Sequence, residues 1–256
     1  MSIQDLRPWV DDQEYQFLCE KLASFYAVEK PSRDVLLQSA NDPEVFRLEK
    51  RVVPQLNRAV ADALECQTLF STVGMRKEPV ILTALCLRPR TLYLLHTEAS
   101  QRTAEAVRDD PDLLALQAES SLEVFLRRIS ETDAPNNYDV VQKEFLGSQN
   151  LGRVVIDPTG GYKIMGISAS AMAFWYRLPM VYLKGVEKLG VVIPFSEELS
   201  VVTNPYEHFG DRDLELLQRL FNNHDYTASI SVCEQLIRTV QDPGMDSMLE
   251  LSLIHI

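Results

Sequence analysis

The chain has 256 residues, and its 25 Lys and Arg residues against 37 Asp and Glu residues give a formal net charge of −12. Hydrophobic residues make up 46% and charged residues 24%, as in a globular protein with one large domain or two smaller ones. This charge excludes wrapping of long nucleic acid, whose phosphates would be repelled over most of the surface, but it permits a small anion in a locally basic pocket.

The sequence contains no apolar run of about 18 residues, so we expect no membrane span. The first residues are acidic and polar, unlike a signal peptide. The four cysteines are scattered through apolar segments, which predicts buried, reduced thiols and a cytoplasmic location. They are Cys19, Cys66, Cys86 and Cys233.

Residues 1–66 are predicted to form a helical N-terminal extension of two helices. One carries Tyr15, Leu18, Leu22 and Phe25 at helical spacing, and the other carries Val53, Leu56, Val60 and Leu64. Pro31 and the segment 39–43 separate them. The extension carries no recognisable chemistry.

Residues 67–203 alternate between short apolar runs and helical segments, which predicts an α/β, Rossmann-like, mainly parallel sheet covered on both faces. The predicted strands are 68–73, 91–96, 122–129, a strand that starts at 154, and 179–183. The predicted helices include 78–87, a helix near 138–145 and 162–176. We expect the last of these to be buried all round.

Beyond residue 185 the pattern is mixed. Residues 191–193 and 199–202 predict a β-hairpin. Residues 204–256 predict a helical hairpin whose helices are joined by 222–225, and we interpret this segment as the start of a truncated effector region. The last residues, 249–256, lack a helix stop and suggest a sequence that is not native.

The segment Asp157-Pro158-Thr159-Gly160-Gly161-Tyr162-Lys163 carries the strongest functional signal. It follows a buried strand and opens an apolar helix, so it combines exposed backbone N–H groups, a hydroxyl and a cation, as a phosphate site requires. A lysine in the first turn opposes the helix dipole, and a bound anion would relieve that conflict. The alternative is a glycine-rich connection needed only for packing.

Two further turns follow strand ends and should meet the first one at one edge of the sheet. In the turn after 68–73, Gly74 permits a sharp bend, and Arg76 or Lys77 could meet phosphate; the alternative is that both are ordinary surface charges. In the turn after 91–96, polar side chains could contact a nucleotide, although Ser100 is more simply a helix cap. The histidines and cysteines show no metal-ligand spacing, so we expect no metal and no cofactor.

These residues resemble the CARF family, the sensor domains of type III CRISPR effectors, and more narrowly its Cas02710-like branch. The resemblance rests on Thr72-Val73-Gly74, on His96 to Ser100 and above all on Asp157 to Lys163, with further similarity at 204–211 and 220–226. Met75 departs from the small or polar residue expected in its turn.

The resemblance implies a homodimer that binds a cyclic oligoadenylate, tetra- or hexa-adenylate, across its twofold axis. The implied ligand-binding residues are Thr72, Gly74, Met75, Arg76, Thr97, Glu98, Ser100, Asp157, Thr159, Gly160, Gly161 and Lys163. Slow, metal-independent ring cleavage with Lys163 as the catalytic residue is also implied. We identify no effector-nuclease motif and therefore predict binding in place of effector catalysis.

Two other hypotheses stay open. One is a Rossmann-like enzyme that uses a nucleotide, although the chain lacks the GxGxxG motif. The other is an adaptor that docks partners through its helical ends.

Overall fold

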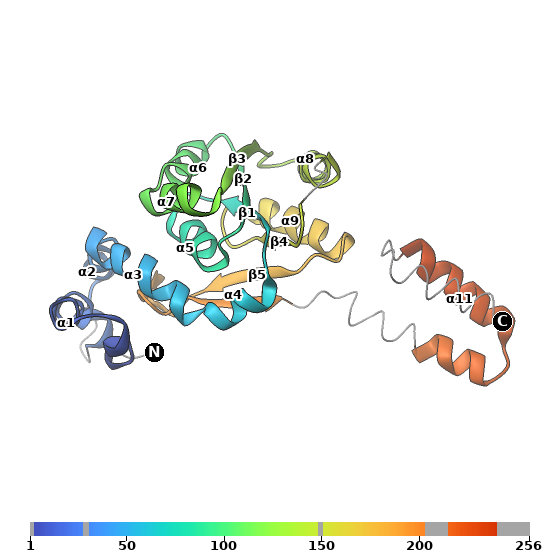
Figure 1. The fold of residues 1–256 in the computed structure, drawn as a ribbon, viewed down its shortest axis with the longest axis horizontal. Helices are drawn as coiled ribbons and strands as arrows, with labels where there is room; N and C mark the ends of the chain where they lie inside the picture. The colour runs from blue at the N-terminus through green and yellow to red at the C-terminus, as the bar shows by residue number, and fades with distance from the viewer. Residues whose placement is uncertain (1–2, 28–30, 148–150, 203–214, 240–256) are drawn as a thin grey trace. The chain divides into compact units, whose positions relative to one another are not determined.

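The computed structural model describes residues 3–27, 31–147, 151–202 and 215–239. The chain divides into two compact units, of which the first spans Met1–Ala173 and Pro179–Val202 and the second spans Phe174–Leu178 and Thr203–Ile256. Figure 1 shows the helices and strands of both units.

A six-stranded sheet with the order β3-β2-β1-β4-β5-β8 forms the centre of the first unit. Its strands are β1 (Thr68–Val73), β2 (Thr91–His96), β3 (Glu123–Arg128), β4 (Val154–Asp157), β5 (Met180–Lys184) and β8 (Glu198–Val202). The first five run parallel, and β8 pairs antiparallel with β5. Every residue of β1 and β4 is buried, as expected of central strands covered on both faces. The predicted mainly parallel α/β fold is confirmed.

Helices cover both faces of this sheet (Figure 1). One face carries α5 (Glu78–Leu87), α6 (Gln101–Arg108) and α7 (Pro111–Ser120), and the other carries α8 (Ala134–Gly147) and α9 (Lys163–Trp175). Aromatic rings from three adjacent strands also stack, since the ring centroids of Phe70 and Tyr93 lie 4.4 Å apart and those of Tyr93 and Phe125 lie 5.3 Å apart. This stacking aligns β1, β2 and β3 in register.

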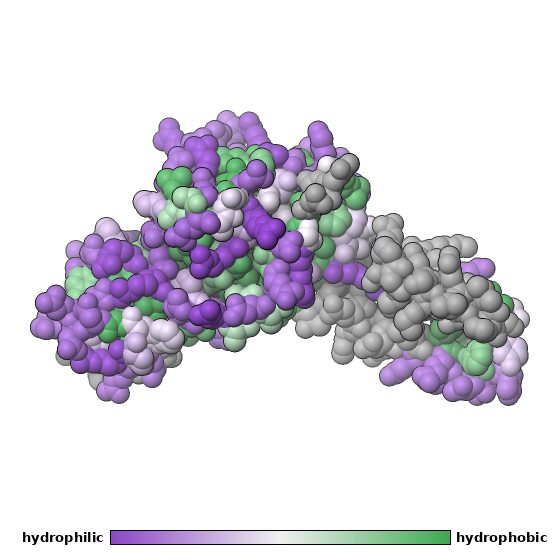
Figure 2. Space-filling model, viewed as in Figure 1, coloured by the Kyte–Doolittle hydropathy of each residue, from purple (hydrophilic) through white to green (hydrophobic). Residues whose placement is uncertain are grey.

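The N-terminal extension contains five helical segments, so the prediction of two helices is wrong. They are η1 (Ile3–Trp9), α1 (Asp12–Tyr26), α2 (Arg33–Ala40), α3 (Pro43–Leu56) and α4 (Arg58–Leu64). Capping explains the extra boundaries, because the side chains of Asp11, Ser32 and Asp42 accept hydrogen bonds from the backbone of the helix that follows each. On the face shown in Figure 2, this region carries mainly hydrophilic side chains.

The extension shares its apolar core with the sheet layer. Val53 and Leu64 belong to the cluster that contains Leu69 of β1 and Ile81 of α5. A second cluster joins α1, α2 and α3 to the segment that precedes β8; its buried members are Leu6, Leu18, Leu22, Phe25, Leu36, Val45, Leu48, Val52, Val191 and Phe195. The extension is therefore packed into the first unit.

Polar side chains lock the segment before β8 onto the extension. The Asn57 side chain donates to the carbonyls of Val53 and Glu197, at 2.9 and 3.0 Å, and accepts from the Leu199 amide at 2.7 Å. The Glu49 carboxylate accepts from the Phe195 amide at 3.1 Å. These bonds explain why the helical run breaks between α3 and α4, at Asn57.

A buried pair of carboxyl groups sits at the same junction. Burial, and then the neighbouring Glu197, raise the pKa of Glu49 well above its ordinary value. Burial raises the pKa of Glu197 to about 7, although its bonding to Glu49 and the charge of Arg76 partly oppose the rise. Because two carboxyl groups are buried together and interact, the junction favours a proton shared between them.

The predicted hairpin of 191–193 with 199–202 is wrong. Instead, β6 (Glu187–Lys188) pairs with β7 (Val191–Val192), and β8 joins the main sheet beside β5. The Asn57 and Glu49 contacts, from residues about 140 positions away in the sequence, hold Leu199 and Phe195 against the extension.

The second unit contains a helix over 215–222 and α11 (Tyr226–Thr239), joined by a short turn. The Asp225 amide donates to the Leu220 carbonyl at 3.0 Å, and the Phe221 and Tyr226 rings meet edge to face at 5.7 Å. The predicted helical hairpin is confirmed for these residues. The prediction about 249–256 lies outside the described residues.

Cys66, Cys86 and Cys233 are buried free thiols as predicted, whereas Cys19 is only half-buried. Burial raises the pKa of Cys66 and of Cys86 to about 12, so both stay protonated at neutral pH. Across the described part of the chain, no helix combines the length and the apolar character that crossing a membrane requires.

Candidate functional site: an anion cradle between two loops

The strand order reverses between β1 and β4. From β1 the chain leads through α5 toward β2 and β3, whereas from β4 it leads through α9 to β5 on the other side. Their connecting loops, 74–77 and 158–162, therefore leave in opposite directions and open a crevice at the carboxyl ends of the strands. As predicted, the three loops after β1, β2 and β4 all follow carboxyl ends of parallel strands at one edge of the sheet.

The loops after β1 and β4 pack backbone against backbone. A Cβ atom on Gly74 would lie 2.6 Å from the Gly161 amide nitrogen, and one on Gly160 would lie 2.2 Å from the Thr72 carbonyl oxygen. Gly161 also has φ +85°, a left-handed conformation that favours glycine. This close approach therefore requires the three glycines. The Thr72 hydroxyl also joins the two loops by donating a hydrogen bond to the Gly160 carbonyl at 2.6 Å.

Asp157 organises the loop after β4. Its fully buried carboxylate accepts from the Thr159 amide at 3.0 Å, from the Thr159 hydroxyl and from the Ser71 hydroxyl at 2.9 Å. Burial raises the pKa of this carboxyl, and the hydrogen bonds from Thr159 and Ser71 partly oppose the rise. The Thr159 oxygen in turn accepts from the Leu183 amide at 3.0 Å. The side chains of Asp157 and Thr159 thus stabilise the conformation of the loop through hydrogen bonds.

Backbone donors remain free where the loop enters α9. The Tyr162 carbonyl accepts from the amides of Met165 and Gly166, at 2.9 and 3.2 Å, so α9 begins there. Among the described residues, nothing accepts from the amides of Gly160, Gly161, Lys163 and Ile164. Lys163 is exposed at the first position of α9 and forms no ion pair within the described chain. We call this group of amides, with the Lys163 ammonium, the anion cradle.

A cavity of about 350 Å³ lies beside the anion cradle. Its lining consists of Gly74, Met75, Arg76, Pro79, Thr159, Gly160, Gly161 and Tyr162. Lys163 borders this set but does not line the cavity. Arg76 forms an ion pair with Glu78, because the Glu78 carboxylate lies 3.3 Å from Arg76 Nε. This pair partly neutralises the charge of Arg76.

Two large apolar side chains flank the cavity and stay exposed. Met75 is 71% and Tyr162 is 48% exposed. The sequence analysis listed Met75 among the ligand-binding residues, although its type departs from the one expected there, and it did not select Tyr162. An aromatic residue placed directly between two glycines and a first-turn lysine was the signal that could have identified it. Such side chains give a nucleobase a surface on which to stack.

No known protein family and no curated protein sequence matches this chain. Solved structures that align with it include Can2 from Sulfobacillus thermosulfidooxidans in complex with cyclic tetra-adenylate, at 17% identity and a TM-score of 0.38. Another is Enterococcus italicus Csm6 bound to cyclic hexa-2'-fluoro-hexa-dAMP, at 13% identity and a TM-score of 0.46. They cover 46% and 66% of this chain, and the chain spans only 32% and 49% of their respective lengths. At this level of similarity, function must be argued from the site itself.

The residues predicted in the turn after β2 do not line the cavity beside the anion cradle. Thr97 and Ser100 are buried and bond to each other, since the Thr97 amide donates to the Ser100 hydroxyl at 3.0 Å and the Ser100 amide donates to the Thr97 hydroxyl at 3.3 Å. Ser100 occupies the position before α6, but its side chain makes no capping hydrogen bond to that helix, so the expected cap is wrong. The two hydroxyls close their own turn.

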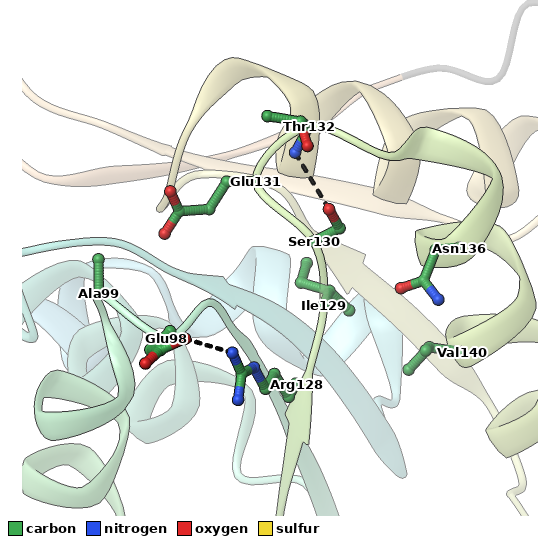
Figure 3. Close-up of a pocket in the computed structure, with 9 residues that line it drawn as sticks. All are labelled: Glu98, Ala99, Arg128, Ile129, Ser130, Glu131, Thr132, Asn136 and Val140. Atoms are coloured by element: carbon green, nitrogen blue, oxygen red, sulfur yellow. Dashed lines mark hydrogen bonds and ion pairs between the residues drawn. The ribbon is translucent and has the colours of Figure 1, made fainter.

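Glu98 lines a separate cavity of about 790 Å³ at the ends of β2 and β3 (Figure 3). There it forms an ion pair with Arg128, a residue that the sequence analysis did not select. The cavity also contains Glu131, and its other lining residues are uncharged. With two carboxylates and one cation, this larger cavity is a poorer place for phosphate than the anion cradle.

Helix α9 differs from its predicted burial. Met165 and Ala169 are buried, but Ile167 is 60% exposed. One apolar face of this helix therefore packs on the sheet while another reaches the surface of the first unit.

The sequence analysis also missed a pair in the second unit. Arg219 and His224 are five positions apart, which is the RxxxxH spacing of HEPN ribonucleases, and the spacing itself was the signal. Arg219 lies in the helix over 215–222, and exposed His224 occupies the turn with φ +59°. The His224 Nδ1 atom lies 2.9 Å from the Tyr226 hydroxyl, and Arg219 Nε donates to the Glu215 carbonyl at 3.3 Å.

Proposed function

We propose that this protein is a sensor that binds a cyclic oligoadenylate in the anion cradle, with residues 67–203 as the sensing region and 204–256 as part of an effector region. The observation that carries the proposal is the set of amides, and the Lys163 ammonium, that lie at the crevice between β1 and β4 and have no partner within the described part of the chain. Such donors suit a phosphodiester, because they hold its charge without a resident counterion.

The neighbouring side chains support an adenylate as the ligand. Met75 and Tyr162 expose apolar surface beside the cavity, which suits a base attached to the bound phosphate. The match of Asp157 to Lys163 with the CARF motif supports the same ligand class. A ring of identical nucleotides fits a twofold homodimer, and the exposed Ile167 face of α9 is apolar surface that a second protomer could cover.

Isothermal titration calorimetry with cyclic tetra-adenylate and cyclic hexa-adenylate tests the proposal. We expect saturable binding of one ring per dimer, and we expect Lys163→Gln to weaken it by about tenfold or more, since one charge-assisted hydrogen bond to phosphate is lost. Lys143→Gln is the matched control, because Lys143 is an exposed lysine on α8 with no ion pair within the described chain.

Absence of saturable heat with either ring at micromolar protein would refute the proposal. If Lys163→Gln and Lys143→Gln weaken ring binding equally, the ring does not bind in the anion cradle.

Cleavage of the bound ring is a further part of the proposal. No described residue that lines the cavity is a histidine or a carboxylic acid. Any cleavage would rest on holding a ribose 2′-hydroxyl in line with its phosphate, while Lys163 stabilises the developing charge. Slow turnover without added metal is the corresponding expectation.

A second candidate function is metal-independent RNA cleavage by the second unit. It is favoured by His224 and Arg219, which offer an imidazole for proton transfer and a cation for phosphate. We expect His224→Ala to abolish any RNA cleavage that cyclic oligoadenylate induces, and Gln218→Ala, an exposed change in the same helix, to leave it intact. Cleavage that survives His224→Ala would exclude this role.

A further inference from the structure

The first unit contains another cavity, of about 570 Å³, between the N-terminal extension and the sheet layer. It is formed by α2, the loop after β1, α6 and the turn between β6 and β7. Its lining consists of Arg33, Leu37, Asn41, Met75, Arg76, Lys77, Glu78, Arg102, Thr103, Ala106 and Gly190. We call it the extension cavity.

The charges around the extension cavity are strongly unbalanced. Four cations line it against one carboxylate, Glu78, and that carboxylate is the partner of Arg76. Arg33, Lys77 and Arg102 form no ion pair with any described residue. In a chain with a formal net charge of −12, three uncompensated cations around one hollow are not explained by average surface composition.

The fold itself does not favour these three cations. Arg33 is the first residue of α2, Lys77 immediately precedes α5, and Arg102 is the second residue of α6. A cation in the first turn of a helix opposes the positive end of the helix dipole. Their mutual repulsion adds to this cost. A bound anion would offset both the conflict with the helix dipoles and the repulsion among the cations.

We propose that the extension cavity is a second phosphate-binding site, which the N-terminal extension completes through Arg33. Arg76 and Lys77 come from the loop after β1, Arg102 comes from α6, and Arg33 comes from α2, so a bound phosphate connects the extension to the sheet. The chemical class of the ligand is a compound with several phosphate groups.

The extension cavity adjoins the cavity beside the anion cradle, because Met75 and Arg76 line both. A ligand with phosphates in both cavities would straddle the loop after β1. That extension to cyclic oligoadenylate rests on the proposed function, whereas phosphate binding in the extension cavity does not.

The test uses inorganic tripolyphosphate as the probe and the full chain as the protein. We expect calorimetry to show saturable binding that weakens with added salt, and we expect the double change Arg33→Gln and Arg102→Gln to weaken it by about tenfold or more. Arg58→Gln is the matched control, since Arg58 is an exposed arginine of the same extension that pairs with Asp62 outside this cavity. All three positions are exposed, and circular dichroism will verify that each variant is folded.

Failure of tripolyphosphate to bind at millimolar concentration, or an equal loss in Arg58→Gln, would overturn the inference. Lys163→Gln separates the two sites, because it should leave tripolyphosphate binding in the extension cavity within about twofold. If tripolyphosphate binds through Arg33 and Arg102 while neither adenylate ring binds, the inference stands and the proposed function fails. If a ring binds and tripolyphosphate does not, the opposite holds.

Discussion

Replacing Gly160 with alanine is expected to lower the free energy of unfolding by about 2–3 kcal/mol and to abolish ligand binding in the anion cradle. The added Cβ would lie 2.2 Å from the Thr72 carbonyl oxygen and 3.2 Å from the Gly74 amide nitrogen. Neither backbone can retreat easily, because β1 is hydrogen-bonded on both sides and the Thr72 hydroxyl holds the loop at 2.6 Å. Urea unfolding followed by circular dichroism measures the effect.

Alanine substitutions at two other glycines serve as controls. They show whether an added Cβ costs stability through a steric clash or through an unfavourable backbone conformation. Gly147 has nothing within 4 Å of an added Cβ and no positive φ, so Gly147→Ala should leave stability unchanged or raise it slightly. Gly190 also has open space but φ +71°, so Gly190→Ala should cost only about 1 kcal/mol. If Gly160→Ala behaves like Gly147→Ala, the two loops do not pack as described.

Replacing Glu197 with glutamine is expected to stabilise the protein at pH 8 by about 3 kcal/mol and to change stability little at pH 4.5. The folded state raises the pKa of this carboxyl from 4.5 to about 7, mainly through burial. An acid with a raised pKa in the folded state stabilises that state while it is protonated, and this contribution is lost as the pH rises from about 4.5 through 7. The expected size follows from about 1.36 kcal/mol per pH unit of displaced pKa.

The measurement is the difference in unfolding free energy between the variant and the wild type, determined by urea unfolding from pH 4.5 to 8. Taking the difference removes the titrating groups that do not interact with Glu197, including the buried Asp157, and leaves the carboxyl pair of Glu49 and Glu197. Glu198→Gln is the matched control, because Glu198 is an exposed neighbour that pairs with Lys184 at 3.2 Å. A difference that stays flat across this range, or that falls as the pH rises, would contradict the buried carboxyl pair.

The central strands could be predicted to the residue. Strands β1 and β2 and helix α5 begin and end where the apolar runs, the glycine turn and the Arg88-Pro89 stop indicated. Buried parallel strands leave this signal because both faces require apolar side chains. The positions of the loops after β1 and β4 then followed from topology alone.

The edges of the unit could not be predicted in the same way. The break at Asn57 and the placement of β8 depend on hydrogen bonds between side chains and backbone about 140 residues apart. Periodicity within a window of 10 to 20 residues cannot report such contacts. The N-terminal caps were readable in principle, since Asp11, Ser32 and Asp42 each precede an amphipathic run.

The sequence predicted which loops form the candidate site, but it did not predict what each side chain in those loops does. Thr159 and Asp157 were selected as ligand-binding residues. In the structure, their side chains instead form hydrogen bonds that hold the loop itself. Polar residues in a tight turn often serve the turn first, and the sequence cannot distinguish the two uses. The exposed Ile167 escaped prediction because helix α9 is apolar on nearly every side.

The contact that builds the anion cradle joins residues far apart in the chain, since Ser71 and Asp157 are 86 positions apart and Thr72 and Gly160 are 88 apart. At a translation rate of roughly 5–20 residues per second, the ribosome needs on the order of 10 s to deliver the second partner after the first. During that interval the nascent chain has β1 with one side unpaired, in what later becomes the middle of the sheet. Such an open edge invites intermolecular pairing, so this stage of synthesis is where we expect a folding chaperone to matter most.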